Sequence, residues 1–175
     1  LSTVLKSLTA LKPKDLVKAL KNLATFTDKI GDKALTKTLL QSLTTLPPKQ
    51  LASSIQHLAT ISKALDSGIL QSVLRSLSSL SPKQLASALQ HLATVSTHIN
   101  SATLNSFLTS ISKLDPSVMG KTIESLALLS TKIDGKVLNS FVTQLSSLNP
   151  KVASTIVNSL APLLSQFDKT TVQNI

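Results

Sequence analysis

Two histidines are the residues best suited to acid–base chemistry or metal binding. His57 and His91 each lie nine residues after a proline, and such a pair could suggest a metal. No carboxylate or thiolate accompanies them, however, and the chain contains no Cys, so a polar surface or an inter-repeat hydrogen bond is the better interpretation. There is also no glycine-rich phosphate loop and no nucleophile–base triad. We therefore expect no catalytic residue, no metal, no cofactor and no small-molecule substrate, and the chain is not predicted to be an enzyme.

Lysines form a second set with chemical potential. Several directly follow a proline that would begin a helix, and a helix N-terminus offers unpaired N–H groups and the positive end of the dipole. A lysine beside these groups suits a phosphate. The predicted phosphate-binding residues are Lys14, Lys49, Lys83 and Lys151 after their prolines, together with Lys18, Lys21 and Lys121. The alternative is an ordinary solvated surface.

A polar stripe recurs eleven, seven and four residues before each of these prolines. Helical-repeat proteins that read RNA use a few polar side chains per repeat, and one stripe per repeat could line a continuous surface. The predicted polar contacts to RNA are Lys6, Lys37, Gln41, Gln71, Arg75, Asn105 and Asn139. The alternative is again a solvated helix face.

These residues are positioned by an internal repeat. Prolines recur about every 34 residues, at Pro13, Pro48, Pro82, Pro116 and Pro150, and a Leu-Ala pair follows each at the same distance. This period is typical of arrays of helix pairs. The sequence therefore predicts an all-α fold, an α-solenoid of helix-turn-helix repeats. We expect a single array over residues 1–175, with units at 1–31, 32–65, 66–99, 100–133 and 134–167 and a sixth start or cap at 168–175.

Each unit is predicted to contain a first helix, a short proline turn and a second helix. An Asp or Asn cap opens the first helix at Asp32, Asp66, Asn100 and Asp134. The helix should then run to the leucine two residues before the proline: Leu46, Leu80, Leu114 and Leu148. Leu5 and Leu20 are expected on the inward faces of the first two helices. Pro162 should kink or shorten the last second helix, and we expect the chain to be a fragment of a longer array.

The net charge restricts the choice of partner. The chain carries 18 Lys and Arg against 8 Asp and Glu, a net charge of +10, which favours a polyanion. The four Phe lie at core spacing and there is no Trp or Tyr, so little is left to stack on bases. We therefore expect contact with the RNA backbone, which fits a structured or ribosomal RNA better than a dedicated messenger.

The segment Ser81-Pro82-Lys83-Gln84-Leu85-Ala86, continued by Leu89, Leu92 and Ala93, resembles the second helix of the octotricopeptide repeat. FAST-kinase-like and RAP-domain proteins carry a related pattern, and the copy from Pro48 to Ala59 is the other close match. The resemblance implies a mitochondrial protein, with the plastid as the alternative, that binds RNA in maturation, translation or ribosome assembly. A subunit of the mitochondrial ribosome or of another ribonucleoprotein is included in that implication.

Two functions from different classes follow. The first is an organellar RNA-binding α-solenoid within a larger ribonucleoprotein assembly. The second is a protein–protein interaction scaffold in an organellar complex. An RNA-binding protein should gather its lysines on one surface, whereas a scaffold has no such requirement. Binding to a membrane surface is not expected, because the lysine stripes lack neighbouring exposed apolar anchors.

Overall fold

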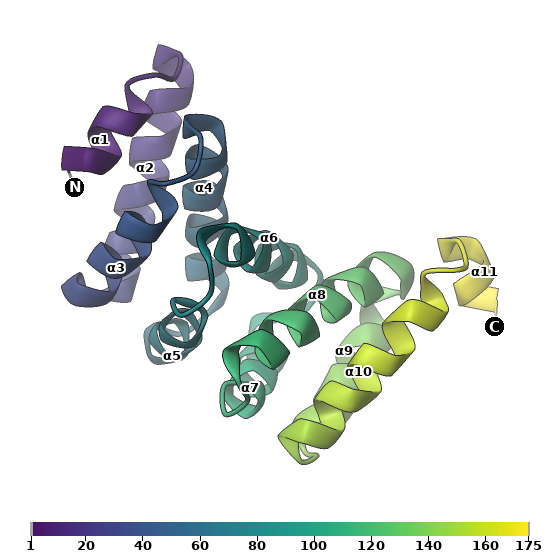
Figure 1. Ribbon diagram of the computed structural model, residues 1–175. Coiled ribbons are helices and arrows are strands. Elements are labelled where there is room, and N and C mark those ends of the chain that lie inside the picture. The colour runs from purple at the N-terminus through teal and green to yellow at the C-terminus, as the bar shows by residue number, and fades with distance from the viewer. Residues whose placement is uncertain (1, 175) are drawn as a thin grey trace. The chain divides into compact units, whose positions relative to one another are not determined.

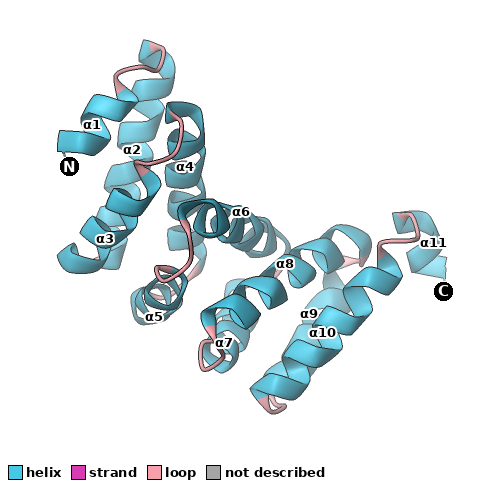
Figure 2. Ribbon diagram, viewed as in Figure 1, coloured by secondary structure: helices cyan, strands magenta, loops and turns pink. Residues whose placement is uncertain are grey.

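The computed structural model describes residues 2–174, without the side chains of residues 169, 173 and 174. All regular elements among these residues are helices, joined by short loops (Figures 1 and 2). In chain order they are α1 (Ser2–Leu8), α2 (Pro13–Ile30), α3 (Lys33–Leu43), α4 (Pro48–Ala64), α5 (Ser67–Leu77), α6 (Pro82–His98), α7 (Ser101–Ile111), α8 (Pro116–Lys132), α9 (Gly135–Ser146), α10 (Pro150–Leu164) and α11 (Lys169–Asn174).

The helices confirm the predicted repeat. The second helix of each pair begins at one of the five repeated prolines; these second helices are α2, α4, α6, α8 and α10. The helix pairs recur about every 34 residues. Helix pairs that belong to the same compact part of the chain pack on one another as in an α-solenoid. The chain divides into two compact units, Leu1–Ala93 and Thr94–Ile175, with the division inside α6. None of the helices in the described part of the chain combines the length and hydropathy needed to span a bilayer.

The predicted caps hold several helix starts. Asp32 accepts a hydrogen bond from the Leu35 amide at 3.1 Å, and this amide, together with Arg75, holds the pKa of Asp32 below its ordinary value of 3.8. Asn100 accepts from the Thr103 amide at 2.9 Å. At the start of α6, the Ser81 hydroxyl accepts from the Gln84 amide at 3.3 Å while the Gln84 side chain accepts from the Ser81 amide at 3.4 Å, a capping box.

The first helices end earlier than the sequence predicted. They stop at Leu43, Leu77, Ile111 and Ser146 rather than at the leucine two residues before the proline. That leucine instead closes a tight turn, as when the Leu46 amide donates to the Leu43 carbonyl at 3.0 Å. The residue directly before each second helix is extended, as at Pro47 with ψ 151° and Asp115 with ψ 144°. A following proline favours this conformation, so the first helix cannot run on into the second.

Within each unit, the core lies between neighbouring second helices and between neighbouring first helices. Within the first unit α2 lies beside α4, and within the second unit α8 lies beside α10 (Figure 1). The expectation that Leu5 and Leu20 point inward was wrong, since each is 39% exposed. In the described chain no earlier helix pair lies against α1 and α2 to cover them. The expectation for Pro162 was right, because α10 has 15 residues where α4 and α8 have 17.

The repeat register predicts unequal costs for truncating equivalent residues. Ile55 and Leu20 both lie seven residues after their prolines, but Ile55 is fully buried. Ile55→Ala should lower the free energy of unfolding by about 2 to 5 kcal/mol, because it leaves a cavity in a packed interface. Leu20→Ala should cost much less. Urea unfolding followed by circular dichroism measures both, and equal losses would contradict the packing described here.

Candidate nucleic-acid interface

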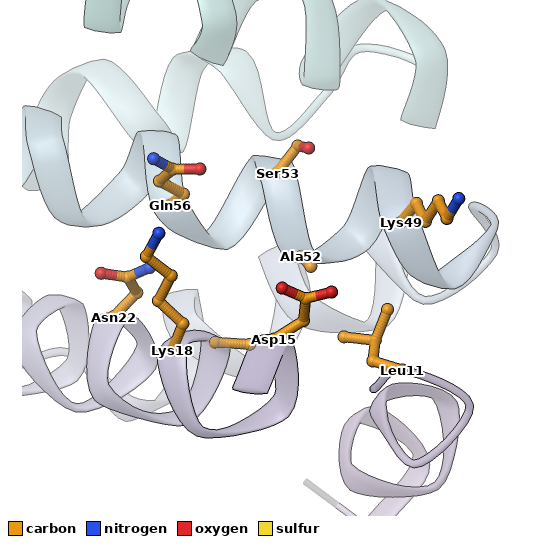
Figure 3. A pocket seen from close by; sticks show the side chains of 9 residues that line it. Leu11, Asp15, Lys18, Asn22, Lys49, Ala52, Ser53 and Gln56 are labelled. Atoms are coloured by element: carbon orange, nitrogen blue, oxygen red, sulfur yellow. The ribbon is translucent and has the colours of Figure 1, made fainter. Parts of the chain in front are cut away.

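Two consecutive grooves run between the second helices of the first unit. The first lies between α2 and α4, has a volume of about 290 Å³ and is shown in Figure 3. Lys18 and Asn22 enter it from α2, and Gln56 faces them from α4, so the polar ends of these three side chains lie near one end. Asp15 lies toward the middle and Lys49 extends past it at the other end. The groove thus contains two lysines and one carboxylate.

The second groove lies between α4 and α6 and has a volume of about 560 Å³. Lys49 from α4 and Lys83 from α6 both line it, so Lys49 is shared between the two grooves. No carboxylate is among its lining residues. Its remaining polar lining is neutral: Gln50, Ser53, Ser54, His57, Ser87 and Gln90. This groove is therefore the more favourable of the two for an anion.

The starts of the lysine-bearing helices differ in how their backbone donors are satisfied. The N-cap residues of α2 and α4, Lys12 and Pro47, make no side-chain capping hydrogen bond. In α10, by contrast, the Asn149 side chain accepts from the Lys151 amide at 2.9 Å. The first backbone amides of α2 and α4 can therefore donate hydrogen bonds to a bound anion, because no N-cap side chain already accepts from them.

The structure brings together only some of the predicted phosphate-binding lysines. All seven are exposed. Lys18, Lys49 and Lys83 line the two grooves, whereas Lys14 and Lys21 lie on the exposed surface of α2 outside the groove linings. The other two, Lys121 on α8 and Lys151 on α10, belong to the second compact unit.

Three of the predicted polar contacts to RNA make contacts between repeats. The Gln71 side chain donates to the Ile30 carbonyl at 2.6 Å, and the Asn139 side chain accepts from the Asn100 amide at 2.9 Å. Arg75 pairs with Asp32 at 3.1 Å. Asn139 and Arg75 thus connect their first helices to the start of the preceding unit, and Gln71 connects its helix to the last residue of α2. Contact of these side chains with RNA stays a prediction.

The remaining polar candidates lie elsewhere. Lys37 and Gln41 line a groove of about 680 Å³ between α1 and α3, together with Val4, Leu40 and the carboxylates of Asp28 and Asp32. The Asn105 amide donates to the Ser101 carbonyl of its own helix at 2.7 Å. Lys6 is exposed on α1. The polar stripe of the first helices therefore does not form a single common lining among the described residues.

His57 is a partly buried titratable group in the α4–α6 groove. Its Nδ1 atom is buried and has no hydrogen-bond partner among the described residues. Burial lowers the pKa of the ring below its ordinary value of 6.5. The imidazole therefore stays neutral at pH 7 and adds no positive charge to the groove that it lines with Lys49 and Lys83.

The neutral and acidic residues of these grooves were not among the predicted site residues. Ser53 and Gln56 follow Lys49 at helical spacing and share its face, and this spacing is a signal that could have identified them. Asp15 follows Lys14 directly, yet its position inside the α2–α4 groove depends on how α4 packs, which local spacing does not determine.

The structure offers no obvious alternative chemistry at this surface. Among the described residues, no group of three or more His, Asp or Glu side chains is placed to hold a metal ion. Comparisons with protein-family models, with curated proteins and with solved structures found no significant match.

The hydrogen bond from Gln71 to Ile30 should contribute more to the stability of the fold than the ion pair of Arg75 with Asp32. Gln71→Ala should lower the free energy of unfolding by about 1 kcal/mol, because it leaves the partly buried Ile30 carbonyl without its donor. Arg75→Ala should cost less, since the Arg75 side chain is 62% exposed and ion pairs with so exposed a partner contribute little. Urea unfolding of both variants tests the ranking, and the reverse order would contradict it.

The environment of His57 predicts a pH effect on stability. Because its folded pKa is lowered, the unfolded chain binds this proton more readily, so stability should decrease as the pH falls below 6.5. The ring resonances of His57, assigned by their loss in His57→Gln, should titrate with a midpoint below 6.5 in an NMR series. A midpoint at or above 6.5 would mean that the ring is not desolvated as described.

Proposed function

We propose that this chain is an RNA-binding helical-repeat protein whose first unit contacts the RNA backbone. The observation that carries the proposal is the partition of charge. Residues 1–93 hold 12 Lys and Arg against 4 acidic residues, a net +8, whereas residues 94–175 hold 6 against 4, a net +2. A polyanion is therefore attracted mainly to the first unit.

The two grooves supply the geometry for backbone contact. The repeat places Lys49 and Lys83 at the same position of successive helices, directly after the proline. Both line the α4–α6 groove, and Lys49 with Lys18 continues the positive lining into the α2–α4 groove. A chain of phosphates following these grooves would meet a cation at each step, with amide and hydroxyl side chains between them to donate hydrogen bonds.

The lining of the grooves favours the backbone over the bases. Among the described residues, no aromatic side chain other than His57 lines either groove, and base stacking is what single-strand binders commonly use for bases. Binding should therefore tolerate many sequences and depend on shape and phosphate spacing. The resemblance to octotricopeptide repeats adds a mitochondrial or plastid location and a ribosomal or other ribonucleoprotein assembly to the proposal.

A protein–protein scaffold is the second candidate, and one observation favours it. The groove between α1 and α3 is the largest of the three in volume and combines Val4 and Leu40 with both signs of charge. Such a mixed lining suits a peptide segment better than a polyanion. The two functions are distinguished by their dependence on salt, since only a polyanion releases condensed counterions.

The proposal predicts salt-dependent RNA binding that depends on the groove lysines. The wild-type chain should bind a fluorescent single-stranded RNA with an affinity that falls steeply as salt rises, measured by anisotropy across a salt series. Lys49→Ala/Lys83→Ala should weaken binding for all RNA sequences alike. The slope of log K against log salt should become less negative by about 0.7 for each phosphate that the variant no longer neutralises.

Two further variants make this experiment specific. Lys113→Ala/Lys136→Ala removes two exposed lysines from the second unit and should have a smaller effect than the groove variant. Asp15→Asn removes the carboxylate from the α2–α4 groove and should tighten binding. Negligible binding by the wild-type chain at low salt would reject the proposal and leave the scaffold, while equal losses in the two double variants would reject the grooves as the site.

A further inference from the structure

The first helix pair exposes apolar side chains at positions that later pairs bury. Leu20, seven residues after its proline, and Leu5, eight residues before it, are each 39% exposed. At the same two register positions in the next two repeats the side chains are at most 4% exposed: Leu40, Ile55, Leu74 and Leu89. We call the surface formed by Leu5, Val17 and Leu20 the leading face.

The second helix of the last full pair, α10, exposes apolar side chains at two other positions that the other repeats bury. Ile156, six residues after its proline, is 36% exposed, and Leu163, thirteen residues after it, is 54% exposed. At these two positions in the other four repeats the side chains are at most 4% exposed: Ala19, Phe26, Ser54, Ile61, Ala88, Val95, Thr122 and Leu129. We call the surface formed by Ile156 and Leu163 the trailing face.

The contacts between neighbouring repeats show how two such faces fit together. In the second unit the hydroxyls of Thr122 and Ser154 are 2.7 Å apart. Thr122 lies six residues after its proline and Ser154 lies four after the next one, so position six of one helix meets position four of the following helix. In the same register Ile156 would meet Val17, which is 52% exposed. The two faces are therefore complementary in register, and both are apolar.

We propose that the trailing face of one copy of this chain binds the leading face of a second copy, head to tail. The contact continues the interface that already joins consecutive repeats. Ile156 and Val17 are larger than the Thr122 and Ser154 pair inside the chain, so the two helix axes lie further apart at this contact. The interface is heterologous, since the two partners contribute different faces, and it extends to further copies as concentration rises.

The charge of the chain sets the salt dependence of this association. Each copy carries a net charge of +10, so copies repel one another at low ionic strength and salt screens that repulsion. The apolar contact itself is not weakened by salt. Association between copies should therefore strengthen as salt rises, in the direction opposite to RNA binding, and the two properties can be measured separately.

Sedimentation velocity on chain 1–175 tests the proposal. In the absence of RNA, the weight-average mass should rise with protein concentration and rise further in high salt. Leu20→Lys and Ile156→Lys should each sediment as monomers, because each destroys one face in every copy. A mixture of the two should form a dimer of twice the monomer mass and nothing larger, because one intact face of each kind remains.

Val118→Lys is the matched control. Val118 is 38% exposed on α8 and belongs to neither face, so this variant should associate as the wild type does, and circular dichroism checks that all three variants are folded. A wild-type chain that stays monomeric at all concentrations and salts would overturn the proposal. Association of Leu20→Lys alone would overturn the head-to-tail arrangement, because it would show a symmetric contact of trailing faces.

Discussion

The structure depends on burial of aliphatic side chains between successive helix pairs. With few aromatic residues, no pair has enough apolar area of its own, so each relies on its neighbour to cover one face. Ile55 and Val157 are fully buried because another second helix lies beside them within the same unit, whereas Leu20, at the same position, is not. Stability, the grooves and the open faces all follow from this dependence on neighbours.

The same packing places the charged residues. Small residues such as Ala19 and Ala52 on facing helices let α2 and α4 approach closely. The polar side chains of the α2–α4 groove come from neighbouring positions on the same two helices. Because the repeat register is constant, Lys49 and Lys83 recur on the same side of successive helices and line one groove. A positively charged groove thus follows from a structural period combined with a lysine at the same position of two successive repeats.

The recurrent prolines and their capping residues made the fold predictable from sequence, since both act within a few residues and determine where helices begin. Other features depend on tertiary packing. Leu20 is exposed because no helix pair among the described residues covers it, and Asp15 lies in a groove because of where α4 packs. The hydrogen bonds that Gln71 and Asn139 make with Ile30 and Asn100 join residues about forty positions apart, so a local polar pattern could equally indicate a free surface.

Amide chemical-shift mapping of the chain during titration with a single-stranded RNA tests the central claim most directly. Backbone contact in the grooves of the first unit predicts that the largest shifts fall on the first turns of α4 and α6 and on the segment of α2 around Lys18, with smaller changes in residues 94–175. Shifts confined to the second unit, or to the lining of the α1–α3 groove, would contradict it.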